Sequence, residues 1–254
     1  MVKKQSRGFQ FKRFFVAHDR CAMKVNMDSV LFGCWIPVSD QSGQQWLDVG
    51  TGTGLLLMML AQRIGTDFLG TGVEIDEKAA LQAQENIERV NHLAPKLTIH
   101  CADIMKYESE SVFDNIVVNP PWFYDSMDSN GTARSKARHI ETINVEHMII
   151  AMVRLLCKKN GRLFVIIPVT SFDTFNHFCI QQGLVLQQRC NVIHQQGKAV
   201  SRVMLRYQFD RLTQSEISEQ DLIVRDRTGQ YSKQFVTMTE NFYLSATEKA
   251  ALKY

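Results

Sequence analysis

The segment FDNIVVNPPWF, residues 113–123, ends an apolar run in an amide, two prolines and an indole ring. The amino group of a nucleobase, like a side-chain amide nitrogen, is a poor nucleophile because its lone pair is delocalised. If the Asn119 side-chain oxygen and the Pro120 carbonyl each accept one of its N–H bonds, the nitrogen can pyramidalise and attack a sulfonium methyl group. The prolines, Pro120 and Pro121, fix the backbone, and Trp122 offers a plane for stacking. We therefore take these four residues as candidate catalytic residues, and the chemistry requires no catalytic histidine.

A second candidate site lies in WLDVGTGTGLLLMML, residues 46–60, between a predicted strand and a predicted helix. Gly50, Gly52 and Gly54 let a ligand approach the backbone closely, and Asp48 comes just before them. The dinucleotide fingerprint is G-x-G-x-x-G, whereas the spacing here is G-x-G-x-G, which argues against a dehydrogenase. A tight structural turn is the alternative interpretation of the glycines alone.

Two further acids strengthen the ligand interpretation. Glu74 ends the second predicted strand, twenty positions after Gly54, where a carboxylate can accept from both hydroxyls of a ribose. Asp103 follows the third strand and can accept from an adenine amino group. Each acid alone is more often a helix cap or a surface residue. Together, at the carboxyl ends of successive parallel strands, they predict a crevice that binds a nucleoside-type ligand.

The elements that position these residues alternate between strand and helix from Gln45 onward, which predicts a parallel sheet with helices on both faces. The last two strands are joined by a short loop, so one of them is antiparallel. The predicted fold class is α/β, with a seven-stranded, mostly parallel sheet. The expected strands are 46–49, 68–75, 97–101, 113–118, 162–167, 184–193 and 200–209; the expected helices are 55–64, one opening near Asp76, 144–158 and 171–182.

Composition sets the outer limits. With 254 residues and 45% hydrophobic content, the chain can form one domain over 1–254. Within it we expect an N-terminal extension at 1–41, a core at 42–209 and a C-terminal tail at 210–254 packed on that core. No apolar run reaches the roughly 18–20 residues of a membrane span, so a cytoplasmic protein is predicted. The six cysteines are scattered without zinc-ligand spacing, which predicts neither disulfide nor metal. Nothing specifies an oligomer, and a monomer is expected.

The N-terminal extension is basic although the net charge of the chain is only +3. Aromatic residues interleave with its cations, which favours a docked segment over a solvated, fraying terminus. On composition we infer a nucleic-acid role for this arm. Its cations are Lys3, Lys4, Arg7, Lys12, Arg13, Arg20 and Lys24, against the single acid Asp19.

From Gln45 to Phe209 the chain resembles the S-adenosylmethionine-dependent methyltransferases of the Rossmann-like class. The resemblance implies S-adenosylmethionine as cofactor, with the glycine turn chosen for close approach rather than for anion binding. It also matches the Asn-Pro-Pro-aromatic signature of enzymes that methylate adenine N6, guanine N2 or glutamine N5. The aromatic is usually Tyr or Phe, so Trp122 is a departure. The implied cofactor residues are Asp48, Gly50, Gly52 and Gly54 at the methionine end, Glu74 and Ile75 at the ribose, Asp103 and Ile104 at the adenine, and Asn119.

The flanks narrow the resemblance. Residues 11–35, FKRFFVAHDRCAMKVNMDSVLFGCW, resemble the N-terminal segment of bacterial adenine-N6 methyltransferases that act on a valine tRNA, with a Lys-x3-Asp-Ser-Val-Leu pattern beginning at Lys24. Residues 133–142 and 229–244 agree with the same family. This implies that the target is adenine 37, beside the anticodon. Asp28 is expected near the methionine end of the cofactor or, alternatively, as the cap of a helix beginning at Ser29.

An RNA substrate gives the remaining cations a role. In the arm we expect Lys12, Arg13, Arg20 and Lys24 to contact RNA, and after the catalytic loop Arg134, Lys136, Arg138 and His139 to clamp phosphates beside a flipped base. Three alternatives remain: a ribosomal RNA guanine-N2 methyltransferase, a release-factor glutamine-N5 methyltransferase, and a non-catalytic nucleotide-binding module. The first two usually carry an extra domain that has no room here, and the third has no need of Asn119 and its prolines.

Overall fold

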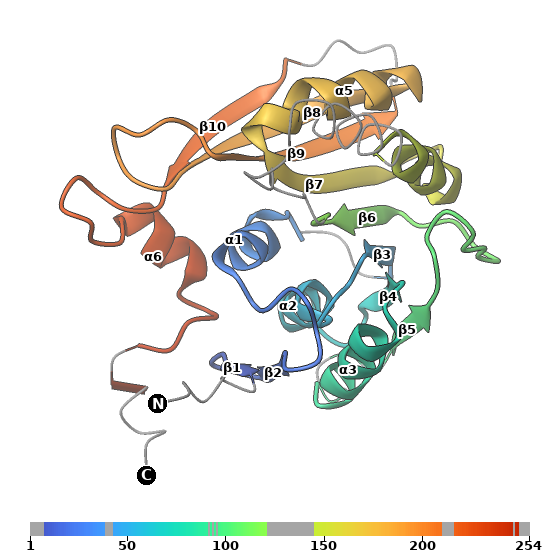
Figure 1. Ribbon diagram of the computed structural model, residues 1–254, viewed down its shortest axis with the longest axis horizontal. Helices are drawn as coiled ribbons and strands as arrows, with labels where there is room; N and C mark the ends of the chain where they lie inside the picture. Colours follow the sequence, from blue (N-terminus) through green and yellow to red (C-terminus); the bar gives the residue numbers. More distant parts are fainter. Residues whose placement is uncertain are drawn as a thin grey trace, which may run out of the picture.

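The computed structural model describes residues 8–38, 43–90, 92, 94, 96–120, 145–209, 216–245 and 247–248. Eight strands form its main sheet: β3 (Gln45–Val49), β4 (Leu69–Glu74), β5 (Lys96–Cys101), β6 (Asn115–Val118), β7 (Arg162–Pro168), β8 (Leu184–Ile193), β9 (Arg202–Phe209) and β10 (Ser218–Ile223). Their order is β10-β8-β9-β7-β6-β3-β4-β5 (Figure 1). Only β9 is antiparallel to its neighbours, β7 and β8. The predicted α/β fold, mostly parallel with one antiparallel strand, is confirmed.

The sheet has one strand more than the seven expected. The additional strand, β10, pairs in parallel with β8 at the edge of the sheet. Its sequence, SEQDLI, is polar except for the last two residues, and only Leu222 is buried. An edge strand facing solvent needs no alternating apolar pattern, so this segment gave no strand signal. Part of the expected C-terminal tail therefore belongs to the sheet.

Helices cover both faces of the sheet. Successive side chains of a strand point to opposite faces, so each strand contributes to two cores. On β3, Trp46 packs in one core cluster with Trp35 and Leu57, whereas Leu47 packs in another with Met152 and Phe175. The helices are α1 (Met27–Trp35), α2 (Leu55–Ile64), α3 (Glu77–Glu88), a helix over residues 145–155, α5 (Phe172–Gln181) and α6 (Lys233–Thr239). Figure 1 shows α1 and α2 on the opposite side of the sheet from α5. Within the described ranges, no helix combines the length and apolarity needed to cross a bilayer.

One predicted helix is shorter than expected. The helix predicted over 144–158 ends at residue 155. The next residue, Leu156, instead forms an isolated parallel bridge with Phe113, and Cys157 N–H donates to the Phe113 carbonyl at 2.8 Å. This bridge pairs the residues before β6 with the residues after the helix, so a β-type contact replaces the last helical turn.

The N-terminal segment docks on the C-terminal part of the chain. Its strands β1 (Gly8–Gln10) and β2 (Phe15–Ala17) form an antiparallel pair. Phe11 and Phe14, at the turn between them, are buried against Phe242, and Lys12 N–H donates to the Phe242 carbonyl at 2.9 Å. Phe11 and Phe14 are thus packing residues of a docked segment, which the interleaving of aromatic residues with cations predicted.

A buried amide is one of the groups that join this segment to the rest of the fold. Asn86, on α3, is fully buried. Its Oδ1 accepts from Ala17 N–H at 3.0 Å, and its Nδ2 donates to the carbonyls of Ala17 at 2.8 Å and Thr53 at 2.9 Å. Because Thr53 lies in the glycine turn, the amide of Asn86 connects the N-terminal segment, α3 and that turn.

The first prediction concerns this amide. Replacing Asn86 with Ala leaves three buried backbone groups without partners, and we expect a loss of about 3 kcal/mol in the free energy of unfolding, since each buried unsatisfied group costs on the order of 1–3 kcal/mol. Urea denaturation measures it. The exposed Lys78 on the same helix is the control, and Lys78→Ala should change stability by less than about 0.5 kcal/mol. Equal effects of the two changes would contradict the assignment.

Candidate active site

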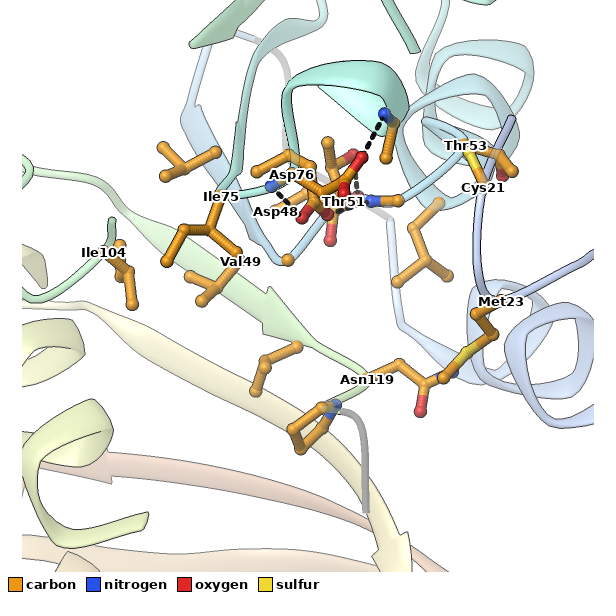
Figure 2. A pocket seen from close by; sticks show the side chains of 18 of the residues that line it. Cys21, Met23, Asp48, Val49, Thr51, Thr53, Ile75, Asp76, Ile104 and Asn119 are labelled. Carbon is orange, nitrogen blue, oxygen red and sulfur yellow. Dashed lines mark hydrogen bonds between the residues drawn. The ribbon is translucent and has the colours of Figure 1, made fainter. Parts of the chain in front are cut away.

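A cavity opens where β3, β4, β5 and β6 end. These strands are parallel, so their carboxyl ends meet at one edge of the sheet, and the cavity there has a volume of about 470 Å³. The predicted site residues that line it are Asp48, Gly50, Gly52, Glu74, Ile75, Asp103, Ile104, Asn119 and Pro120. Figure 2 shows Asp48, Thr51 and Asp76 on one side of the cavity and Asn119 on the other.

The glycine turn has the backbone conformation that its composition predicts. Gly50, Gly52 and Gly54 have φ values of +67°, +55° and +79°, a region that other residues rarely adopt. The N–H groups of Gly50 and Thr51 donate to the Val73 carbonyl at 2.8 and 3.1 Å. The turn after β3 is therefore held against the end of β4.

Glu74 contributes the side-chain part of this attachment. Its Oε2 accepts from Gly52 N–H at 2.8 Å, and its Oε1 accepts from Asp76 N–H at 3.0 Å. A carboxylate offers about four acceptor positions, so lone pairs remain for the hydroxyls of a ribose. Glu74 thus fixes the turn as well as lining the cavity, a double role that the sequence did not reveal.

Asp48 is the most deeply buried acid of the site, with 1% of its surface exposed. Its Oδ2 accepts from Thr51 Oγ1 at 2.6 Å. Burial raises the pKa of Asp48 to about 7; the Thr51 hydrogen bond opposes this rise and the charge of Glu74 adds to it. A buried carboxylate with this pKa favours a cationic ligand, whose charge would replace the lost solvation.

The remaining cofactor candidates form the outer part of the cavity. Ile75 exposes 70% of its surface, a high value for an apolar side chain, and Ile104 lines the same cavity. Asp103 Oδ1 accepts from Met105 N–H at 3.0 Å, which directs the loop after β5. Asp76 caps α3 through Ala79 N–H at 2.8 Å, where a helix opening was predicted. Apolar surface next to carboxylate acceptors suits an adenosine group.

The catalytic candidate Asn119 follows the last residue of β6. Its Nδ2 donates to Ser29 Oγ on α1 at 2.8 Å. The other end of the amide, Oδ1, is the acceptor that the proposed chemistry requires, and Pro120 lines the cavity beside it. Pro121 and Trp122 lie outside the described residues, as do Arg134, Lys136, Arg138 and His139, so these predictions stay predictions.

Two predicted cofactor residues do not line the cavity. Gly54 is the N-cap residue of α2, at the end of the glycine turn. Asp28 Oδ2 accepts from Arg202 Nε at 3.0 Å, so its charge is used in an ion pair between α1 and β9. The alternative role of Asp28 as a helix cap is wrong: Asn26 caps α1, accepting from Ser29 N–H at 2.8 Å. The amide that caps the helix lies two positions before Asp28.

The cations of the arm differ in their surroundings. Lys12 is 3.7 Å from Glu248, and Arg20 pairs with Glu85 on α3. Arg13 is exposed, with no ion pair in the part of the chain that the structure describes, and Lys24 lines the cavity. Arg13 and Lys24 therefore carry charge that is available to a polyanion.

Sequence reasoning missed several residues of the cavity wall. They include Cys21, Ala22, Met23 and Val25 from the N-terminal segment, Ser29 from α1, and Thr51, Ala79, Val145 and Met148. Ser29 stood inside the Lys-x3-Asp-Ser-Val-Leu pattern, which was the available signal. The apolar wall residues Ala22, Met23 and Val25 gave none, because their contact with the site depends on the docking of the arm. Among the described residues, no group of three or more His, Cys, Asp or Glu side chains could hold a metal ion.

Comparisons with known proteins place this chain in a family. The family model of the methyltransferase small domain matches residues 24–171, more than half of the chain. The chain belongs to this family. It is 37% identical over 239 residues to a protein of Bacteroides fragilis (strain YCH46) named tRNA1(Val) (adenine(37)-N6)-methyltransferase, covering 93% of this chain and 97% of that protein. A protein of the same name from Dickeya chrysanthemi (strain Ech1591) is 38% identical over 245 residues, covering 94% of each.

The fold is also found in a solved structure. The crystal structure of a predicted O-methyltransferase, protein Atu636 from Agrobacterium tumefaciens, matches 85% of this chain and 96% of its own with a TM-score of 0.64 at 16% identity. At that identity the likeness concerns the fold alone. Together with the family, it confirms the predicted Rossmann-like methyltransferase fold.

The chain is therefore a methyltransferase, and S-adenosylmethionine is its methyl donor. The cavity fits this cofactor on two observations. Its ribose and adenine positions offer carboxylates and apolar surface, and its inner end holds the buried carboxylate of Asp48 for a cationic group.

The second prediction follows from the pKa of Asp48. The cationic methionine end binds the ionised carboxylate, and this form becomes dominant only as the pH rises through about 7. The dissociation constant for S-adenosylmethionine should therefore fall by about tenfold between pH 6 and pH 8, the ratio of ionised fractions. Calorimetric titration measures it. Asp48→Asn reports the ligand's own pH dependence, and an equally steep change in that variant would contradict the assignment.

Proposed function

We propose that this methyltransferase acts on the exocyclic N6 of adenine 37, beside the anticodon of a valine tRNA. The observation that carries the proposal is the position of Asn119 and Pro120, which directly follow β6 and line the cofactor cavity. Asn119 lies across the cavity from Asp48 and Asp76 (Figure 2). The full-length similarity to relatives of that name supports the choice of substrate.

In this reaction the chain's own residues bind and orient the target. The flipped adenine donates one amino hydrogen to Asn119 Oδ1 and the other to the Pro120 carbonyl, so that its nitrogen becomes tetrahedral and its lone pair points at the methyl group. The nitrogen forms a bond to the methyl carbon as the bond from that carbon to sulfur breaks. The product nitrogen is acidic enough to lose its proton to water, so no side chain has to act as a base.

The main alternatives use the same two acceptors. Guanine N2 in ribosomal RNA and glutamine N5 in a release factor present planar nitrogens of similar geometry, and the cofactor half of the cavity does not distinguish between them. The length of the chain favours the tRNA enzyme, because the two named relatives are covered almost completely. A monomer acting in the cytoplasm, where tRNA is modified, remains our prediction.

The test is transfer of labelled methyl groups from S-adenosylmethionine to three acceptors in parallel: unmodified valine tRNA, ribosomal RNA and a release factor. We expect N6-methyladenosine in the tRNA alone, identified by nucleoside analysis. Label in guanosine or in protein would overturn the substrate while leaving the role of Asn119 in place. Absence of label in all three would favour a binding module.

The third prediction concerns Asn119. Asn119→Ala removes one of two acceptors that act on the target nitrogen, and we expect kcat to fall by at least about 100-fold. The dissociation constant for S-adenosylmethionine should change by no more than a few fold, because the ribose and adenine positions are unaltered. Single-turnover kinetics and calorimetry measure the two quantities. A parallel loss of both would show that Asn119 is structural.

The fourth prediction concerns the cations of the arm. RNA binding by Arg13 releases counterions, so Arg13→Gln should lower the salt slope of tRNA affinity by about one unit. Arg20 is the matched control, because Glu85 already neutralises it. Arg20→Gln should leave the slope nearly unchanged. Binding measured by fluorescence anisotropy over a salt series compares the two, and a slope that Arg13→Gln leaves at the wild-type value would remove Arg13 from the RNA interface.

A further inference from the structure

We propose that Ser29 is a positioning residue for the methyl transfer, holding the Asn119 amide in the one orientation that presents Oδ1 to the target amino group. This inference rests on the proposed function. Its basis is the 2.8 Å hydrogen bond from Asn119 Nδ2 to Ser29 Oγ, the only side-chain hydrogen bond of Asn119 within the described part of the chain. The two residues are ninety positions apart and come from different elements, α1 and β6.

The orientation of this amide matters because its two ends are nearly the same size. The terminal torsion of Asn is broad, so an amide without partners samples both orientations. With Oδ1 toward the cavity it accepts from the adenine amino group; with Nδ2 there, donor faces donor and the nitrogen cannot pyramidalise. A serine hydroxyl can accept or donate, and here it accepts from Nδ2. In that arrangement Oδ1 is left for the target amino group before the substrate arrives, which is preorganisation in the sense used for catalytic donors.

Ser29 is able to do this because its own position is fixed. The Ser29 N–H donates to the capping side chain of Asn26, and the neighbouring Asp28 forms the ion pair with Arg202 on β9. At the other end of α1, Arg63 Nη1 donates to the carbonyls of Gly33 at 2.6 Å and Ile36 at 2.7 Å. The helix is thus attached at both ends, and its hydroxyl stands at a defined distance from β6.

The buried face of α1 adds to this rigidity. Val30, Leu31 and Phe32 have no exposed surface, and Trp35 stacks on Phe32 with ring centroids 6.4 Å apart. The backbone of Ser29, one residue before this buried run, cannot shift without moving the core. The ion pair of Asp28 gains a role from this: it holds the helix that carries Ser29, rather than contacting the cofactor itself.

The competing explanation is that Ser29 binds the cofactor directly, since its side chain also lines the cavity. The two roles differ in what they change. A cofactor ligand changes the dissociation constant of S-adenosylmethionine, whereas a positioning residue changes kcat and leaves that constant alone. They also differ in a second way: the effect of a positioning residue depends on whether residue 119 is an amide, whereas the effect of a cofactor ligand does not.

The first experiment compares Ser29→Ala and Ser29→Thr with the wild type. We expect kcat of Ser29→Ala to fall about tenfold, with the cofactor dissociation constant and the KM for tRNA within twofold, and Ser29→Thr, which keeps the hydroxyl, to recover most of the rate. Thermal unfolding verifies that each variant is folded. Ser29→Cys, which has the size of serine but a weak acceptor, takes the place of Ser29→Ala if that variant does not fold. A loss of cofactor affinity equal to the loss in kcat would overturn the proposal.

The second experiment uses Asn119→Asp as the background. The two oxygens of a carboxylate are equivalent. Whichever way the carboxylate at position 119 is turned, an acceptor oxygen faces the target amino group, so no orientation has to be selected. Adding Ser29→Ala to Asn119→Asp should therefore lower kcat by less than about twofold, against about tenfold in the wild type, which is the non-additivity expected for residues in contact. The same ratio in both backgrounds would overturn the positioning role.

The design separates this inference from the proposed substrate. The wild type is first assayed on tRNA, ribosomal RNA and a release factor, and the Ser29 ratios are measured on whichever acceptor it methylates. Failure on tRNA with normal ratios on another acceptor overturns only the substrate. If tRNA is methylated but Ser29→Ala lowers kcat by the same factor in the wild-type and Asn119→Asp backgrounds, only the role of Ser29 is overturned.

Discussion

The hydrogen bond from Gly52 N–H to the Glu74 carboxylate is the contact on which the cofactor half of the site depends. Neighbouring parallel strands end at the same edge of the sheet, but that alone leaves the turns after them free to point anywhere. Here one carboxylate at the end of β4 holds the glycine turn that follows β3, and the Val73 carbonyl next to it accepts twice from the same turn. The turn is thus shaped before any ligand arrives, and positive φ angles make glycine necessary for that shape.

This arrangement has an electrostatic consequence. Closing the turn over the end of β3 removes Asp48 from water and places it near the charge of Glu74, so its pKa rises to about 7. Two carboxylates so close together would be unfavourable in an empty structural turn, where Asn or Ser could form the same hydrogen bond to Thr51. The cost is reasonable only for a site that receives a cation. The two acids therefore indicate that the cofactor is cationic, whereas the glycines indicate that it lies close to the backbone.

The sequence was informative where chemistry is local and uninformative where it depends on docking. Asp48, Gly52, Glu74 and Asp103 were identified because strand, turn and helix follow one another in a regular order, and parallel pairing then brings their ends together. β10 was missed because an exposed edge strand needs no apolar pattern. For Asp28 the sequence did not reveal the ion pair with Arg202, because the two residues are 174 positions apart and no local pattern reveals such a partner.

The same limit explains why part of the cavity wall could not be predicted. Residues 21–25 and the hydroxyl of Ser29 line the cavity but come from a segment that precedes the main sheet altogether. That segment reaches the site because Asn86 bonds it to α3 and the glycine turn, and because Phe11 and Phe14 pack against Phe242 near the other end of the chain. The sheet therefore supplies the carboxylates, the glycine turn and Asn119, whereas the docked segment supplies Ser29 and part of the wall of the same cavity. Neither part makes the cavity alone.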